Sequence, residues 1–235
     1  MSNETDNGNE EYSSELNKLY ENRFIGTENK DNQYKREALW KVLCNHFFSK
    51  YINPDDVVCD VAAGYCEFIN NIKVRKKIAV DLNPSVREFA KSEVEVINDN
   101  VFNLKKYLVK GDVSCFFVSN FLEHLDSKKD VLNLIAELSD LLDKDGKIVI
   151  LQPNIRLVGG AYWDFIDHKV ELTEKSLIEA AEINNLSVDT CITRFLPYTT
   201  KSAIPKSSFL VYLYLKMMPL SSFFMGKQSF LVLRK

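Results

Sequence analysis

The chain has 235 residues, which is enough for one domain of ordinary size and short for two. Apolar residues make up 46% and charged residues 27%, as in soluble globular proteins, and the net charge of -3 argues against a nucleic-acid partner. The five cysteines include no CxxC pair, which favours buried free thiols in a reducing compartment over a disulfide framework or a zinc site. No secretory signal pattern opens the sequence, so we expect a cytoplasmic protein.

The N-terminal part is predicted to be a tail followed by helices. Residues 1–10 are polar and predict a disordered tail. Helical patterns cover residues 12–23 and 34–48, and in the second one Leu39, Trp40 and Leu43 recur at three- and four-residue spacing.

From residue 57 onward, strand and helix patterns alternate. Helices are predicted to begin near residue 65 and at Pro84. A third helix is expected to begin at a cap formed by Asp126 or Ser127 and to end just before Gly146, and a fourth is expected to follow a cap at Thr173. The expected strands are residues 57–61, 76–82, 93–98, 113–120 and 147–154, followed by two late antiparallel strands in 187–199 and 229–235. Continuous apolar strands separated by helices indicate a parallel sheet covered on both faces.

The C-terminal segment is apolar and basic. Residues 209–224 are rich in aromatic and aliphatic side chains, but Lys216 and Pro219 interrupt them before the roughly 18–20 residues that a membrane span needs. From Lys201 to the end there are six bases and no acid. This segment is predicted either to face an anionic ligand or a membrane surface as a peripheral contact, or to form a solvated rim.

The turn after the first strand indicates a ligand site. Asp60 ends the strand, Gly64 lets the backbone pass close to a ligand, and Asp81 ends the second strand, where an acid can accept the hydroxyls of a ribose. A dinucleotide site requires G-x-G-x-x-G because the pyrophosphate sits on bare backbone, and this turn has one glycine. The pattern therefore favours an adenosyl ligand without phosphates.

The ordered segments VVCDVAAGYCEF, IAVDLNP, VINDNVFNL, FFVSNFLEHL and GKIVILQPN resemble the class I S-adenosylmethionine-dependent methyltransferases over roughly residues 34–235. The resemblance implies a doubly wound, mostly parallel seven-stranded sheet of the Rossmann-like type, with residues 11–50 as an N-terminal helical lid and residues 51–235 as the cofactor-binding domain. The later segments GGAYWDFIDHKVELTEKSL, RFLPYTT and GKQSFLVLRK look like a bacterial branch linked with surface-polysaccharide and glycan genes.

The resemblance assigns S-adenosylmethionine as the cofactor and implies its binding residues, strand end by strand end. They are Asp60, Ala62 and Gly64 for the amino-acid part, Asp81 for the ribose, Leu82 against adenine, Asp99 or Asn100 for the adenine amine, and Asn120 with Phe121 beside the methyl group. The family usually has glycine at the positions of Ala62 and Cys66, and the Cys66 side chain either crowds the cofactor or packs. Other interpretations stay open: Asp60 or Asn120 caps a helix, and Asp81 is a turn residue.

The loop after the fifth strand carries the candidate catalytic group. His168 is predicted to act as a base oriented by Asp167, or else to tie the loop down. His46 is interpreted as structural, and His124, after the fourth strand, either approaches the site or, as preferred here, packs or forms a hydrogen bond. Further substrate contacts are expected from Tyr162 and Trp163 through their rings, and from Arg194, Tyr198 and Lys201 toward an anionic acceptor. Tyr20, Arg23 and Phe24 are expected either to close over the cofactor or to pack elsewhere.

These features predict methyl transfer to a hydroxyl or amine of a small acceptor, with a sugar-containing or lipid-linked molecule, a glycan or a nucleotide-sugar as candidates. No metal-ligand spacing is visible, so no metal dependence is expected. Two alternatives remain. One is a nicotinamide-dependent oxidoreductase, and the other is a catalytically inactive cofactor-binding module that serves as a partner subunit.

Overall fold

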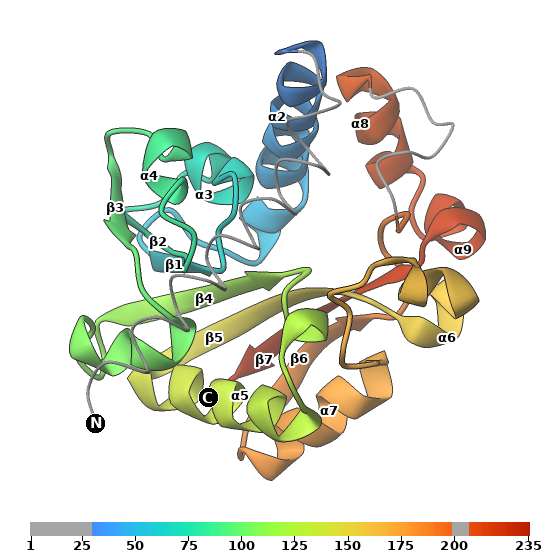
Figure 1. The fold of residues 1–235 in the computed structure, drawn as a ribbon. Helices are drawn as coiled ribbons and strands as arrows, with labels where there is room; N and C mark the ends of the chain where they lie inside the picture. Colours follow the sequence, from blue (N-terminus) through green and yellow to red (C-terminus); the bar gives the residue numbers. More distant parts are fainter. Residues whose placement is uncertain (1–29, 199–206) are drawn as a thin grey trace.

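A computed structural model describes residues 30–198 and 207–235, which form one seven-stranded sheet with helices on both faces (Figure 1). The strands are β1 (Val57–Val61), β2 (Lys76–Val80), β3 (Val94–Ile97), β4 (Val113–Ser119), β5 (Leu142–Pro153), β6 (Ser187–Ile192) and β7 (Gln228–Arg234). Their order across the sheet is β3-β2-β1-β4-β5-β7-β6.

The sheet is mostly parallel. β1, β2, β3, β4 and β5 run parallel, β7 pairs antiparallel with β5 so that Leu151 lies opposite Phe230, and β6 forms the edge. The chain reverses the direction of winding between β1 and β4, which is where open α/β sheets bind ligands at the carboxyl ends of their strands. The predicted fold class is confirmed, and of the two late strands expected to be antiparallel, β7 runs against the rest of the sheet whereas β6 is antiparallel to β7 alone.

The α-helices cover the two faces of the sheet (Figure 1). They are α2 (Lys30–His46), α3 (Glu67–Asn71), α4 (Val86–Phe89), α5 (Lys128–Leu141), α6 (Ile155–Val158), α7 (Glu174–Ile183), α8 (Ser208–Lys216) and α9 (Leu220–Met225). Short 3-10 helices are η2 (Phe48–Lys50), η3 (Val101–Lys106), η4 (Leu122–His124) and η5 (Gly159–Asp164). The helices α2, α3 and α4 lie on one face, and α5 and α7 lie on the other.

Each face has its own apolar core, because the side chains of a strand alternate between faces. Cys59 and Phe116 face α5 and α7, whereas Val58 and Phe117 face α2 and α3. On the α2 face, stacked rings of Phe68 and Phe117 lie 3.5 Å apart between centroids. The strands are therefore buried on both sides, which accounts for their continuous apolar sequences.

The α2 helix belongs to this core. Leu43 on the helix, and Phe47 and Phe48 just beyond its end, are buried in the apolar core on the α2 face. The rest of the predicted lid, with Tyr20, Arg23 and Phe24, lies outside the described residues, as does the predicted tail of residues 1–10.

The predicted end of the helix that Asp126 or Ser127 was expected to cap is wrong. α5 ends at Leu141 instead of running to Gly146, although Ser127 caps its start as expected, accepting a hydrogen bond from the Asp130 amide. Residues 142–146 extend β5 instead, with a register irregularity between Val113 and Cys115 on the neighbouring strand. Thr173 caps α7 through a reciprocal capping box with Ser176, as predicted.

Four of the cysteines are buried free thiols and Cys191 is exposed. The prediction of free thiols agrees with the structure, and the prediction that they are buried holds for all of the cysteines except Cys191.

Candidate functional site

The turn after β1 is a strained backbone segment. Ala62, Gly64 and Cys66 have φ angles of 56°, 52° and 56°, in the left-handed region that favours glycine. The amide of Ala63 donates to the carbonyl of Val80 at 3.0 Å, which ties the turn to β2. The Cys66 side chain is fully buried in the core on the α2 face, so of the two predicted alternatives it packs.

Asp81 connects this turn with the end of β2. Its carboxylate accepts a hydrogen bond from the Gly64 amide at 2.7 Å and another from the Asn83 amide at 2.8 Å. Burial raises the pKa of Asp81, and the two amide donors partly offset that rise. Asp81 thus builds the turn, and the second lone pair on each oxygen is left for a ligand hydroxyl.

Asp60 lies beneath the same turn. Burial raises the pKa of Asp60 well above its usual range, the negative charge of Asp81 raises it further, and a hydrogen bond from the Ile69 amide in α3 opposes the rise. The contact with Ile69 shows that Asp60 supports the first turn of α3. The two acids predicted to bind the cofactor therefore lie close enough for the charge of Asp81 to shift the pKa of Asp60.

The end of β3 places the two candidates for the adenine amine. The Asp99 carboxylate accepts hydrogen bonds from the Asn103 amide group at 2.8 Å and the Tyr107 hydroxyl at 2.7 Å. Partial burial acts to raise the pKa of Asp99, but these donors lower it overall. The side chain of Asn100 caps η3 by accepting from the Phe102 amide at 3.0 Å. Both candidates thus have local partners.

Asn98 is a residue that sequence analysis missed. Its side-chain amide donates to the carbonyl groups of Asp81 and Leu82 at 2.9 and 3.0 Å. It therefore fixes the backbone where the predicted ribose and adenine contacts meet. Its position directly after β3, next to Asp99, could have identified it from the sequence as a residue of the site.

The end of β4 presents Asn120 toward solvent. Asn120 has a φ angle of 49°, its amide donates to the carbonyl of Leu151 on β5 at 2.9 Å, and its side chain is exposed. The residue before η4 is Phe121, with no side-chain cap, so Asn120 does not cap that helix. The half-buried Phe121 packs against the core on the α5 face.

A polar cluster follows directly on η4. One potential ligand atom from each of Glu123, His124 and His168 lies within 4.8 Å of the other two. A carboxylate oxygen of Asp167 lies 3.2 Å from Nδ1 of His124. Nδ1 of His168 instead lies 2.7 Å from the carbonyl oxygen of Tyr162. The predicted orientation of His168 by Asp167 is therefore not what the structure shows, because Asp167 orients His124.

The two imidazoles have opposite pKa shifts. For His168, burial lowers the pKa, which keeps the ring neutral near pH 7. For His124, burial acts to lower the pKa, but the carboxylates of Asp167 and Glu123 raise it overall. His124 was interpreted as structural, and only the folded loop reveals its partners.

The predicted substrate residues lie in different surroundings. Tyr162 is fully buried and its hydroxyl donates to the carbonyl of Val170 at 2.5 Å, so it holds the loop and has no free ring face. Trp163 beside it is 51% exposed. Arg194 donates to the carbonyl of Gly226 at 3.3 Å, near α9, while Tyr198 lies close to Phe165 with ring centroids 6.0 Å apart. Lys201 lies outside the described residues.

Several solved structures have this arrangement of strands and helices. A S-adenosylmethionine-dependent methyltransferase from Archaeoglobus fulgidus matches with a TM-score of 0.63 at 18% identity, covering 92% of this chain and 98% of that one. A possible histamine N-methyltransferase from Thermotoga maritima matches with 0.63 at 14% identity, over 92% and 98%. Geranyl diphosphate C-methyltransferase from Streptomyces coelicolor A3(2), solved with Mg²⁺, geranyl diphosphate and S-adenosylhomocysteine, matches with 0.53 at 16% identity, over 77% and 74%.

No family model matches the sequence, and no curated protein is significantly similar to it. The structural similarity at these identities shows the fold. The chain has the fold of the class I S-adenosylmethionine-dependent methyltransferases.

Proposed function

We propose that this protein binds S-adenosylmethionine and transfers its methyl group to a small acceptor. The observation that carries the proposal is the hydrogen bond from the Gly64 amide to the Asp81 carboxylate. It joins the turn after β1 to an acid at the end of β2, where this fold binds its ligands. One adenosyl ligand would thus meet the turn with its amino-acid part and Asp81 with its ribose.

The turn favours a cofactor without phosphates. Ala62 and Cys66 stand where the turn has left-handed backbone, and both carry a Cβ atom. A pyrophosphate needs bare amides at a helix start, whereas a sulfonium ligand does not. This supports S-adenosylmethionine over a nicotinamide dinucleotide.

Calorimetry with S-adenosylmethionine, S-adenosylhomocysteine and NAD tests the cofactor. We expect one equivalent of each adenosyl ligand to bind and NAD not to bind. Replacing Asp81 by Ala should weaken binding by about 10- to 100-fold, the equivalent of a lost hydrogen bond to a charged group. Glu95→Ala, which removes an exposed acid from the neighbouring strand β3, is the matched control. Binding of NAD instead would favour the oxidoreductase.

The acceptor is proposed to be a hydroxyl or amine of a small molecule, with sugar-containing and lipid-linked compounds as the first to test. The sulfonium of S-adenosylmethionine already activates the methyl group, so the main task of the enzyme is to align the nucleophile with it. The exposed indole of Trp163 offers an apolar ring for stacking on a sugar face. The link with polysaccharide genes and the cytoplasmic location stay predictions.

His168 is proposed to act on an acceptor hydroxyl. Its Nδ1 faces a carbonyl oxygen, so Nδ1 carries the proton and Nε2 keeps its lone pair. Methyl-transfer assays on glycan intermediates with His168→Ala test this role, and near-normal turnover would contradict it. If cofactor binds but no acceptor is methylated, the alternative of an inactive partner subunit is favoured.

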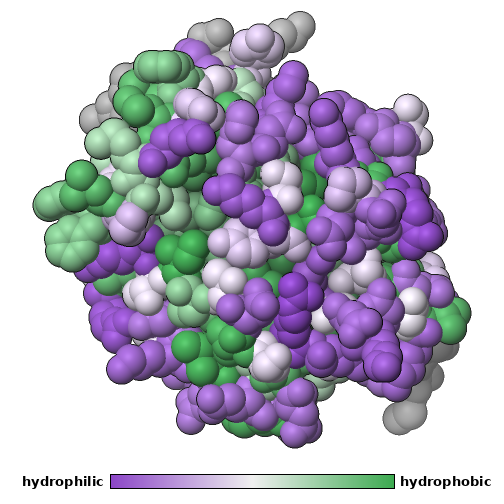
Figure 2. Space-filling view, turned by 180° about the vertical axis from the view of Figure 1, so that it is seen from behind, coloured by the Kyte–Doolittle hydropathy of each residue, from purple (hydrophilic) through white to green (hydrophobic). Residues whose placement is uncertain are grey.

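We also propose that α8 and α9 touch an anionic lipid surface. Exposed apolar side chains gather on these helices and the turn between them, and Figure 2 shows an apolar surface on the side of the molecule where the two helices lie. They are Phe209, Leu213, Met217, Leu220, Phe223 and Phe224. Lys216 lies among them in the sequence and Lys227 follows them, and the sequence from residue 201 onward has no acid. Within residues 30–198 and 207–235, no helix is long and apolar enough to cross a bilayer, so the contact would be peripheral.

A further inference from the structure

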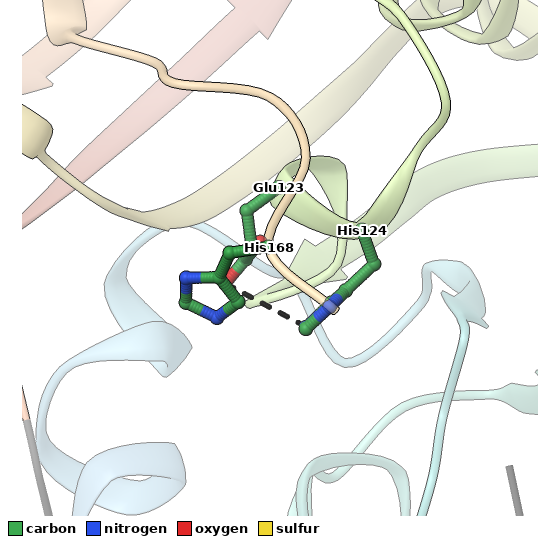
Figure 3. A group of neighbouring side chains, drawn as sticks. All are labelled: Glu123, His124 and His168. Carbon is green, nitrogen blue, oxygen red and sulfur yellow. Dashed lines mark ion pairs between the residues drawn. The ribbon is translucent and has the colours of Figure 1, made fainter. Parts of the chain in front are cut away.

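Three metal-ligating side chains converge at the carboxyl ends of β4 and β5. Glu123 and His124 come from the single turn of η4, and His168 comes from the loop that follows η5 (Figure 3). The ring centroids of the two histidines are 5.0 Å apart, and Nε2 of His124 lies 4.0 Å from Oε1 of Glu123. Residues far apart in the sequence thus form one compact group.

Hydrogen bonds determine which nitrogen of each ring is free. Nδ1 of His124 lies 3.2 Å from a carboxylate oxygen and 3.1 Å from the carbonyl oxygen of Asp167. Nδ1 of His168 lies 2.7 Å from the carbonyl oxygen of Tyr162. Both Nδ1 atoms face acceptors only and therefore carry protons, which leaves both Nε2 atoms with lone pairs. Metal-binding histidines in proteins are held by this pattern.

Glu123 supplies the anionic group. It is 1% exposed, and its Oε2 accepts a hydrogen bond from the side chain of Gln152 on β5 at 3.0 Å. Among the described residues, no lysine or arginine forms an ion pair with Glu123, and the nearest ring nitrogen is Nε2 of His124, 4.0 Å from Oε1. A buried carboxylate without a full cation is costly, so a cation at Oε1 would stabilise it.

We propose that Glu123, His124 and His168 bind a divalent first-row transition-metal ion. Two imidazoles and one carboxylate suit Zn²⁺, Fe²⁺, Co²⁺ or Mn²⁺ rather than Mg²⁺ or Ca²⁺, which prefer oxygen ligands. Bonds of about 2.0–2.1 Å would bring the ligand atoms to about 3.3 Å from one another. Rotation of the half-buried His124 and His168 side chains closes the remaining gap. Three protein ligands leave positions open for a substrate oxygen.

The location gives the ion a chemical role, which rests on the proposed methyl transfer. Asn120, predicted to lie beside the methyl group, precedes η4 on the same chain segment. With the ion bound, Nε2 of His168 would be a metal ligand and would act on the acceptor hydroxyl through the ion instead of as a base. A hydroxyl bound to the cation would lose its proton to solvent more readily. Its oxygen lone pair then forms the new bond to the methyl carbon, the sulfur–methyl bond breaks, and the sulfur keeps the bonding electrons. A hydroxyl acceptor is therefore favoured over an amine.

The test measures metal binding directly, without substrate. Protein treated with EDTA and desalted is titrated with Co²⁺, whose visible absorption reports its ligands, and Zn²⁺ is then added as competitor. We expect one equivalent of Co²⁺ in the wild type and in His46→Gln, which alters an exposed histidine on α2. His168→Asn should abolish this absorption. Asp167→Asn should weaken binding by about 10- to 100-fold, because it removes the group that orients His124.

The outcomes separate this inference from the proposed function. Equal Co²⁺ binding by the wild type and by His168→Asn, or none by either, overturns the metal site. Glu123→Gln is measured as well, with a thermal melt, and His168→Asn keeps the test valid if that buried variant fails to fold. Binding of S-adenosylmethionine in EDTA is measured separately, so its loss would contradict the cofactor proposal alone.

Discussion

The backbone at Ala62 and Cys66 explains a departure of this chain from the family it resembles. Both residues have positive φ angles, which an L side chain adopts at a cost of about 1–2 kcal/mol. Glycine adopts them freely, so the usual glycine at these positions follows from the geometry of the turn. At Cys66 the buried side chain offsets part of this strain by packing.

Replacing Ala62 by Gly should stabilise the protein. Relief of the left-handed strain exceeds the added entropy of the unfolded chain, and the net gain is about 0.5–1 kcal/mol. Thermal unfolding should therefore move up by roughly 1–4 °C for a chain of this size. The matched control is Ala63→Gly, because Ala63 has no positive φ angle, and this variant should lower the melting temperature. A rise in both variants would contradict the argument.

The pKa shifts of Asp60 and Asp81 predict pH-dependent cofactor binding. Burial raises the pKa of both carboxyls in the free protein, and the charge of Asp81 raises that of Asp60 further. Ligand hydroxyls and a positive ligand charge favour the ionised carboxylates, so binding should release protons. Affinity for S-adenosylmethionine should thus fall as the pH falls through these raised pKa values. Calorimetry from pH 8 to pH 5 measures this trend, and an affinity that is flat or rises toward acid would contradict it.

At the scale of elements, a buried ion pair joins the amino ends of the central strands. Nζ of Lys147 on β5 lies 2.7 Å from Asp56, just before β1, with the two side chains only 4% and 11% exposed. Ser114 on β4 donates its hydroxyl to Asp56 at 3.2 Å and accepts from the Val57 amide at 2.8 Å. This network lies at the end of the sheet opposite the candidate site.

Replacing Lys147 by Met should reduce stability by about 3–5 kcal/mol, because it leaves a buried carboxylate unpaired. The double variant Asp56→Asn/Lys147→Met should lose less, because no buried charge is then left unpaired. Chemical denaturation of the wild type, both single variants and the double variant measures the coupling. Affinity for S-adenosylmethionine in the folded variants should stay unchanged, and additive losses would show that the pair does not interact.

The strands were predictable because burial on both faces gives continuous apolar sequences. The end of α5 was not, since residues 143–146 are polar and the extension of β5 depends on the pairing of Leu142 with Val113 on β4. Ser127 and Thr173 were identified as caps because a cap is a local interaction. Element identity thus follows from local sequence, whereas a boundary set by a neighbouring strand does not.

For the whole molecule, the topology decides which site residues meet. Asp60 and Asp81 were predicted together because strand ends of a parallel sheet share one edge. The pairing of His124 with Asp167 depends on how the loop after η5 folds back onto η4, which no local pattern encodes. The burial of Tyr162, which was predicted to contact the substrate, also depends on how this loop folds, so the sequence did not indicate it.

The exposed apolar side chains of α8 and α9 predict that the protein binds anionic membranes. Phe223 and Phe224 on α9 are 66% and 74% exposed, near the bases Lys216 and Lys227. Insertion of these rings into an anionic bilayer surface buries apolar area while the lysines contact the headgroups, each worth about 1 kcal/mol. The protein should therefore sediment with vesicles of phosphatidylserine and phosphatidylcholine, and less with phosphatidylcholine alone.

The double variant Phe223→Ser/Phe224→Ser should lose this sedimentation, while Ile166→Ser should keep it. Ile166 is 87% exposed but lies in the loop after η5, so it controls for the mere loss of an exposed apolar side chain. Because electrostatic attraction is screened by salt, binding should also weaken as the ionic strength rises. If the aromatic pair instead joins two copies of this chain, the variant will change the molecular mass in solution and leave vesicle sedimentation as it was, and the lipid contact is then excluded.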